Sequence, residues 1–342
     1  MSGHVNRGHS FVVFVVLIGV GLVTLLGYYF GYVPYLQAGS TSTQKTTLLM
    51  DTVVDIRVDG RNPEVLIENV FDTVEDLEGM LSRFIADSEI SEINRRAGQW
   101  VKVSPLTLEV IELGLELGAL TGGAFDITIG AVLDLWGFGS GEYYVPTEEE
   151  LQSVLATVDY RNVEVDKGKS QVRIPRGTVL DLGGIAKGHI VDQGIQILRN
   201  ARVERAFINA GGDISAIGRR QDNQAWRVGV QDPENPSEIR FILPLDDQSV
   251  VTSGDYQRFF TYEDVRYHHI IDPRTGYPAR GVTSVTIVGD NSATCDALST
   301  AVFVLGWKEG RELVERVPDV EAIIVSSTDV WISPGLAKVV TR

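Results

Sequence analysis

Cysteine is almost absent from this chain of 342 residues, which contains only Cys295. A single cysteine excludes an intrachain disulfide, an iron–sulfur cluster and any zinc site built from several thiolates. It also excludes a lipoprotein anchor, because no cysteine follows the apolar run near the start of the sequence.

Basic residues are scarce as well. The chain has 30 Lys and Arg against 46 Asp and Glu, which gives a formal net charge of −16. Since nucleic-acid binding relies on a basic surface, this charge disfavours nucleic acid as a partner. The content of 12 Pro, 35 Gly and 44% hydrophobic residues is ordinary for a globular chain and excludes a collagen-like or disordered one.

Charged side chains are missing between Ser10 and Gln44, and residues 11–30 read FVVFVVLIGVGLVTLLGYYF. This run matches the length of about 20 residues that a membrane-spanning helix needs. We expect residues 1–37 to be an uncleaved signal anchor; the alternative is a cleaved signal peptide ending near residues 38–40. Arg7 predicts a single pass through the cytoplasmic (inner) membrane, with the rest of the chain on the periplasmic, extracytoplasmic side.

The remainder predicts an α+β fold with mixed or antiparallel sheets and flanking helices. We expect a linker at 38–48 and one domain over 49–342. Apolar spacing and capping residues predict helices at 64–84, 106–120, 186–199, 293–304 and 308–316, and one that begins after Thr147. The expected strands are 49–58, 163–165, 171–174, 179–182, 206–208, 214–217, 226–231, 239–245, 282–288 and 322–325.

Residues 267–278, YHHIIDPRTGYP, carry two of the five histidines. The side chains of His268 and His269 point to opposite faces if this segment is extended, so at most one faces a given ligand. Histidine changes its charge near neutral pH and is suited to take a proton from a hydroxyl. A pair of satisfied core or surface histidines is the competing interpretation.

Three glycine turns follow predicted strands: residues 181–188 (DLGGIAKG), 209–213 (NAGGD) and 251–256 (VTSGDY). Glycine lets a backbone approach a ligand closely, and a helix start after the first turn favours an anion. The spacing GGxxxG is neither a Walker A motif nor a dinucleotide-binding fingerprint.

Asp296 and Thr300 are four residues apart in a predicted helix, which places a carboxylate and a hydroxyl on one helix face. Both oxygens are ligands that Mg²⁺ accepts. An acid near a helix N-terminus that only stabilises the helix dipole is the alternative. Glycine turns, a lysine, an acid–hydroxyl pair and a possible base together indicate a site that handles phosphate.

In order along the chain, these segments resemble the ApbE family of FAD:protein FMN transferases over about residues 46–335. The matching stretches are residues 50–52, 87–91 with Asn94, 124–128 with 135–138, 181–188, 209–213, 252–256, 269–276 and 296–300. The chain departs from the family at Asp51, where Gly is usual after the methionine, and at His268, where Ser is common.

The resemblance implies an Mg²⁺-dependent enzyme that attaches FMN from FAD through a phosphoester to a Thr or Ser hydroxyl of a target flavoprotein and releases AMP. Family acceptors include subunits of sodium-translocating NADH:quinone reductase and Rnf-type redox complexes. Carried onto this sequence, His269 is the base, and Asp296, Thr300 and the carbonyl of Ala186 hold Mg²⁺. The implied FAD-site residues are Met50, Phe84, Ala124, Phe125, Asp126, Gly183, Lys187, His189 and Ile270.

Other functions stay open at this point. An FAD pyrophosphatase uses water in place of the acceptor hydroxyl and yields FMN and AMP. A non-catalytic periplasmic protein that stores or delivers FAD, and a purely structural membrane-anchored domain, are the remaining alternatives.

Overall fold

The computed structural model describes residues 41–235 and 237–341. The signal anchor expected at 1–37 lies outside them. Within the described ranges, no helix has both the length and the apolar character that crossing a membrane requires.

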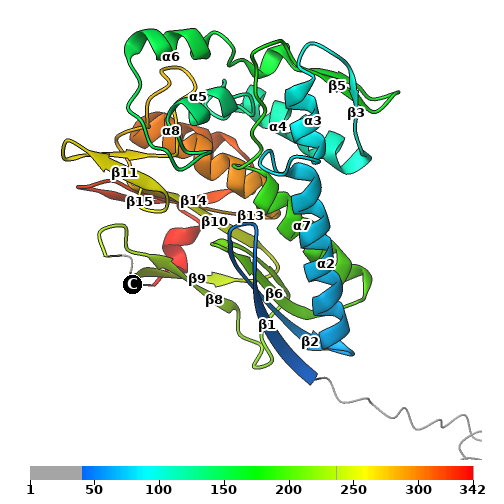
Figure 1. Ribbon diagram of the computed structural model, residues 1–342. Helices are drawn as coiled ribbons and strands as arrows, with labels where there is room; N and C mark the ends of the chain where they lie inside the picture. Colours follow the sequence, from blue (N-terminus) through cyan, green and yellow to red (C-terminus); the bar gives the residue numbers. More distant parts are fainter. Residues whose placement is uncertain (1–40, 236, 342) are drawn as a thin grey trace, which may run out of the picture. The chain divides into compact units, whose positions relative to one another are not determined.

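An eight-stranded antiparallel sheet forms the centre of the domain (Figure 1). The strand order is β1-β2-β6-β7-β10-β13-β14-β15, and every neighbouring pair is antiparallel. These strands are β1 (Thr41–Leu49), β2 (Thr52–Gly60), β6 (Arg205–Ala210), β7 (Asp213–Ile217), β10 (Ser249–Gly254), β13 (Ser284–Gly289), β14 (Glu321–Val325) and β15 (Val330–Ile332). The expected α+β class is confirmed in its antiparallel form.

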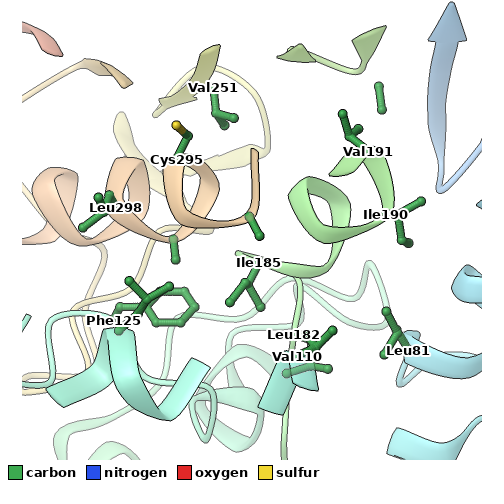
Figure 2. Packing of buried hydrophobic residues seen from close by; sticks show 14 of the residues in the cluster. Leu81, Val110, Phe125, Leu182, Ile185, Ile190, Val191, Val251, Cys295 and Leu298 are labelled. Carbon is green, nitrogen blue, oxygen red and sulfur yellow. The ribbon is translucent and has the colours of Figure 1, made fainter. Parts of the chain in front are cut away.

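Three helices pack on the sheet: α2 (Pro63–Leu81), α7 (Ala186–Asn200) and α8 (Ser292–Arg316). α2 contacts β2, α7 contacts β6 and β7, and α8 contacts β10 and β13. Figure 2 shows Cys295 of α8 beside Val251 of β10, and Val191 of α7 belongs to the same buried hydrophobic cluster. This packing fixes α7 and α8 beside each other.

A hairpin of β8 (Trp226–Gln231) and β9 (Ile239–Leu245) builds a second hydrophobic cluster against the sheet. Residues of β8 alternate strictly between buried and exposed, as expected for a strand with one face in a core. Trp226 and Phe241 pack there with Ile214 of β7 and Val250 of β10.

Shorter elements complete the domain. The helices are α3 (Glu89–Arg95), α4 (Pro105–Leu120), α5 (Gly130–Leu135) and α6 (Glu148–Leu155), with 3₁₀ turns η1 (Tyr160–Asn162) and η2 (Leu336–Lys338). The strands are β3 (Val101–Lys102), β4 (Glu164–Asp166) and β5 (Gln171–Arg173), which form a small sheet, and the hairpin of β11 (Phe259–Tyr262) and β12 (Val265–His268).

The linker expected at 38–48 is wrong for the part that the structure describes. Residues 41–49 form β1, which pairs along its length with β2. Its exposed and half-buried residues alternate, so these polar residues form an edge strand. Met50 and Asp51 make a two-residue turn with φ of 54° and 53°, and the strand expected at 49–58 begins only at Thr52.

The strand expected at 179–182 needs correction. Residues 179–182 make only an isolated bridge, between Val179 and Ile129, because the N–H of Leu180 is bound by the Asn94 side chain and that of Asp181 by the carbonyl of Ile127. The two helices expected at 293–304 and 308–316 are confirmed: α8 contains both, and a kink with non-helical backbone at Gly306, where φ is 72° and ψ is −162°, separates them.

Candidate active site

A cavity of about 690 Å³ opens where the β1–β2 turn, the start of α7 and one face of α8 meet. Its walls include the turn residues 50–52, the segment 124–126, the glycines 183 and 184, and the segment 269–271. The sheet and helices therefore gather segments that are far apart in the sequence around one space.

Gly188 explains how α7 and α8 come together at this cavity. A Cβ on Gly188 would lie 2.4 Å from the carbonyl oxygen of Ser292, so only glycine permits this approach. The backbone N–H of Gly188 donates to Oδ2 of Asp296 at 3.3 Å. The third glycine of the motif at 181–188 thus serves helix packing and holds the Asp296 carboxylate.

Lys187, Asp213 and Asp296 form a charged group in the cavity wall. Nζ of Lys187 donates to both carboxylate oxygens of Asp213 at 2.8 Å. Asp213 and Asp296 are only 2% and 4% exposed. Burial and the neighbouring Asp213 raise the pKa of Asp296, and Lys187 opposes this. Two carboxylates share one ammonium, so a cation would stabilise this group.

Asp296 and Thr300 both line the cavity from α8, as their spacing predicts. Cys295, which directly precedes Asp296, is buried near Gly289 and does not line the cavity. Ala186 is the first residue of α7 and is half-buried; it does not line the cavity, although Gly184 and Lys187 on either side do. In the described part of the chain, no three His, Cys, Asp or Glu side chains cluster as metal ligands. The expected Mg²⁺ site has only one such side chain, the Asp296 carboxylate, and takes its other oxygens from a hydroxyl and a backbone carbonyl, so the absence of a cluster of three acidic, His or Cys side chains among the described residues does not argue against it.

The two adjacent histidines have different surroundings. His268 is buried, donates from Nε2 to the carbonyl of Ala279 at 2.8 Å and packs against Phe303. It is a core histidine with its polar atoms satisfied, since Nδ1 accepts the N–H of Ile270 at 3.3 Å. His269 lines the cavity.

A hydrogen bond sets the tautomer of His269. Its Nδ1–H donates to the backbone carbonyl of Arg258 at 3.1 Å, and a carbonyl can only accept. Nε2 therefore carries the lone pair. Burial and the positive charge of Arg258 lower the pKa of His269, which keeps the imidazole neutral at neutral pH. A neutral imidazole with a free Nε2 is suited to accept a proton.

Eight of the nine expected FAD-site residues line the cavity: Met50, Phe84, Ala124, Phe125, Asp126, Gly183, Lys187 and Ile270. Phe84 presents an aromatic ring that is 58% exposed. The carboxylate of Asp126 accepts hydrogen bonds from Thr128 and from the N–H of Tyr160, so it also orders its own loop. Burial raises its pKa.

His189 is not brought to this cavity. It lines a separate cavity of about 330 Å³ together with Asp192 and Gln193. The reason is helix geometry, because His189 lies two positions after Lys187 on α7 and is therefore rotated from it by about 200° around the axis.

Several cavity residues were missed by sequence reasoning. Arg83 follows α2 and its guanidinium binds the carboxylates of Asp134 and Asp181, and it stacks over the Phe84 ring at 4.5 Å. Arg258 lies between β10 and β11. No local pattern marks either arginine, since both are defined by contacts with distant segments.

The comparisons with known proteins agree with this geometry. The model of the ApbE family matches residues 50–324. A FAD:protein FMN transferase of Treponema pallidum is 34% identical over 302 residues, which cover 82% of this chain and 83% of the relative. One from Klebsiella pneumoniae is 33% identical over 267 residues, covering 77% of this chain and 83% of the relative.

Solved structures give the same result. The ApbE protein of Thermotoga maritima superimposes with a TM-score of 0.83 at 36% identity, covering 87% of this chain and 99% of that one. The flavin transferase ApbE of Vibrio cholerae gives a TM-score of 0.79 at 28% identity, covering 88% and 99%. The chain belongs to the ApbE family.

Proposed function

We propose that this protein is an FAD:protein FMN transferase, which moves FMN from FAD to a Thr or Ser hydroxyl of an acceptor flavoprotein and releases AMP. The observation that carries the proposal is a single cavity lined by a neutral histidine, His269, by the buried carboxylate of Asp296 and by the half-buried hydroxyl of Thr300. The names of the relatives support the same activity.

His269 acts as the general base. Its Nε2 takes the proton of the acceptor hydroxyl as the hydroxyl oxygen bonds to the flavin-side phosphorus, and the bond from that phosphorus to AMP breaks. The carbonyl of Arg258 keeps the ring oriented throughout, because it holds Nδ1–H.

Mg²⁺ is the metal that this site fits. Asp296 and Thr300 would provide oxygen ligands from one face of α8, and the carbonyl of Ala186 at the start of α7 would be the third ligand that family resemblance implies. Lys187 is bound to Asp213, and burial together with Asp213 raises the pKa of Asp296, so a second cation would stabilise the ionised form of Asp296. When bound, Mg²⁺ neutralises charge on the pyrophosphate.

The rest of the cavity wall is the proposed FAD-binding surface. Met50, Phe84, Phe125 and Ile270 offer apolar and aromatic surface for a flavin or adenine ring, and Gly183 leaves the backbone open to the ligand. Ala124, Asp126 and Lys187 complete the proposed FAD site. His189 is left out of it because it lines the other cavity.

We place the domain on the periplasmic side of the cytoplasmic membrane, anchored by residues 1–37, as the apolar run at 11–30 suggests. Acceptor subunits of sodium-translocating NADH:quinone reductase or Rnf-type complexes are the proposed partners.

The test is to incubate the full chain, purified in detergent, with FAD, Mg²⁺ and a candidate acceptor. The expected result is an acceptor heavier by one FMN, equimolar AMP, and no transfer when EDTA replaces Mg²⁺. Release of free FMN and AMP would indicate a pyrophosphatase instead. Bound but unchanged FAD would indicate a carrier.

A further inference from the structure

Three cationic side chains line the cavity in the part of the chain that the structure describes: Arg83, Lys187 and Arg258. Arg83 is paired with Asp134 and Asp181, and Lys187 with Asp213. No carboxylate of the described residues lies within ion-pair distance of Arg258, whose guanidinium makes one hydrogen bond, from Nη2 to the carbonyl of Phe138 at 3.0 Å.

Arg258 is thus the one of these three cations without a carboxylate partner among the described residues. Most other arginines of the described part form ion pairs with carboxylates, among them Arg266, which pairs with Asp255 at 3.5 Å. A guanidinium has five N–H donors and binds phosphate through two of them at once. Arg258 thus keeps donors free at the wall of a cavity that also contains His269.

The backbone of Arg258 restricts where its side chain can act. Its carbonyl accepts both the backbone N–H of His269 at 3.1 Å and the ring Nδ1–H at 3.1 Å. The guanidinium is therefore tied to the same short segment that orients the base, and its charge acts on the imidazole. An anion held by the Arg258 guanidinium would therefore lie in the same cavity as His269.

We propose that Arg258 binds the flavin-side phosphate of FAD, the phosphate that is transferred, and holds it next to Nε2 of His269. This inference rests on the proposed function, which makes that phosphorus the atom attacked by the acceptor hydroxyl. As the new P–O bond forms and the bond to AMP breaks, the guanidinium stabilises the negative charge on the phosphoryl oxygens. The proton goes to His269 and the electron pair leaves with AMP.

The experiment compares ligands with and without each phosphate, in EDTA, so that neither metal nor turnover enters. Dissociation constants are measured by calorimetry for FMN and riboflavin, and for AMP and adenosine. The wild-type protein is expected to prefer FMN over riboflavin by about tenfold or more, the effect of a charge-assisted hydrogen bond. Arg258→Gln should bring that ratio near one and leave the AMP-to-adenosine ratio unchanged.

Matched variants control for folding and for net charge. Arg266→Gln on β12 removes the same charge outside the cavity lining and is expected to keep the wild-type ratio. Arg258→Lys keeps the charge, loses the two-pronged geometry and should retain part of the preference for FMN. Thermal melting checks that each variant folds, and the lysine variant decides the question if the glutamine variant does not fold.

A wild-type protein without a preference for FMN, or an Arg258→Gln variant that keeps it, overturns the assignment. An equal loss in the AMP-to-adenosine ratio also overturns it, because the contact would then not be specific to the flavin side. Failure of transfer to every acceptor contradicts the proposed function, whereas the ratio of dissociation constants still decides the role of Arg258.

Discussion

His269 is the residue on which the proposed chemistry depends most directly. Replacing His269 with Ala removes the only cavity histidine of the described residues and leaves the apolar wall for FAD in place. We expect the transfer rate to fall by about 100-fold or more, the usual contribution of a general base. FAD affinity, measured by flavin fluorescence, should change little. An unchanged rate would remove His269 from the mechanism.

The same residue predicts the pH dependence of transfer. Burial and Arg258 lower the pKa of His269, and His268 and Lys187 act in the same direction. The base is therefore unprotonated through neutral pH and loses activity only when pH falls through a value below the ordinary histidine pKa of about 6.5. Single-turnover rates between pH 4 and 8 check this, and an acid limb above 6.5 would contradict it. Arg258→Gln should move the limb to higher pH.

Asp51 has an unfavourable backbone conformation. Its φ of 53° lies in the left-handed region, where a side chain costs about 1 kcal/mol. Asp51→Gly, the residue usual in the family, should raise the free energy of unfolding by about 0.5–1 kcal/mol. Denaturant unfolding measures this. Ser42→Gly, in the extended part of the same hairpin, is the control and should lower stability by a similar amount.

At the scale of elements, Asp192 connects α7 to the beginning of α8. Its carboxylate accepts the backbone N–H of Ser292 at 2.7 Å and of Ala293 at 2.9 Å, two groups that no bond within α8 satisfies. Because α8 carries the proposed metal ligands one and two turns further on, this contact fixes them relative to α7.

Asp192→Ala is therefore expected to lower the free energy of unfolding by about 1–2 kcal/mol and to raise the Mg²⁺ concentration needed for half-maximal transfer. Thr147→Ala is the matched control, since it removes the capping box of α6, away from the cavity. It should cost similar stability and leave the Mg²⁺ titration unchanged. Equal Mg²⁺ titrations in the two variants would show that Asp192 only supports the fold.

The helices were predictable where the information is local. α2, α4 and α6 have apolar spacing or caps, and the Thr147–Glu150 capping box forms as the sequence indicates. β1 was missed because its polar residues read as a linker, and only pairing with β2 makes them a strand. Residues 179–182 satisfy their backbone through Asn94 and Ile127, which no pattern along the chain reveals.

The residues of the candidate site also fall into two groups, those that a local sequence motif predicts and those that it does not. The glycine turns, Lys187, His269, Asp296 and Thr300 stand in recognisable motifs, and the structure brings them to one cavity. Arg83 and Arg258 lie outside any pattern, because their roles come from carbonyls and carboxylates contributed by other segments. His189 is the opposite case, because it stands next to the motif but helix rotation brings it to the separate cavity.

At the scale of the molecule, an acidic protein has to bind an anionic dinucleotide. The formal net charge is −16, and the cavity itself has more carboxylates than cationic side chains. Salt screens the resulting repulsion, so without Mg²⁺ the association rate of FAD should rise by about twofold or more between 20 and 300 mM NaCl. Stopped-flow fluorescence measures it, with uncharged riboflavin as the control. A rate that falls with salt would indicate local attraction instead.

The wide sequence span of the cavity, from Met50 to Thr300, has a consequence for biosynthesis. A growing chain has no flavin site until almost all of it has left the ribosome, because α8 supplies the last wall. Long-range contacts of this kind form slowly and together, since each closes a large loop. FAD therefore encounters a finished pocket, and stabilises the folded protein as a ligand without guiding the nascent chain toward its fold.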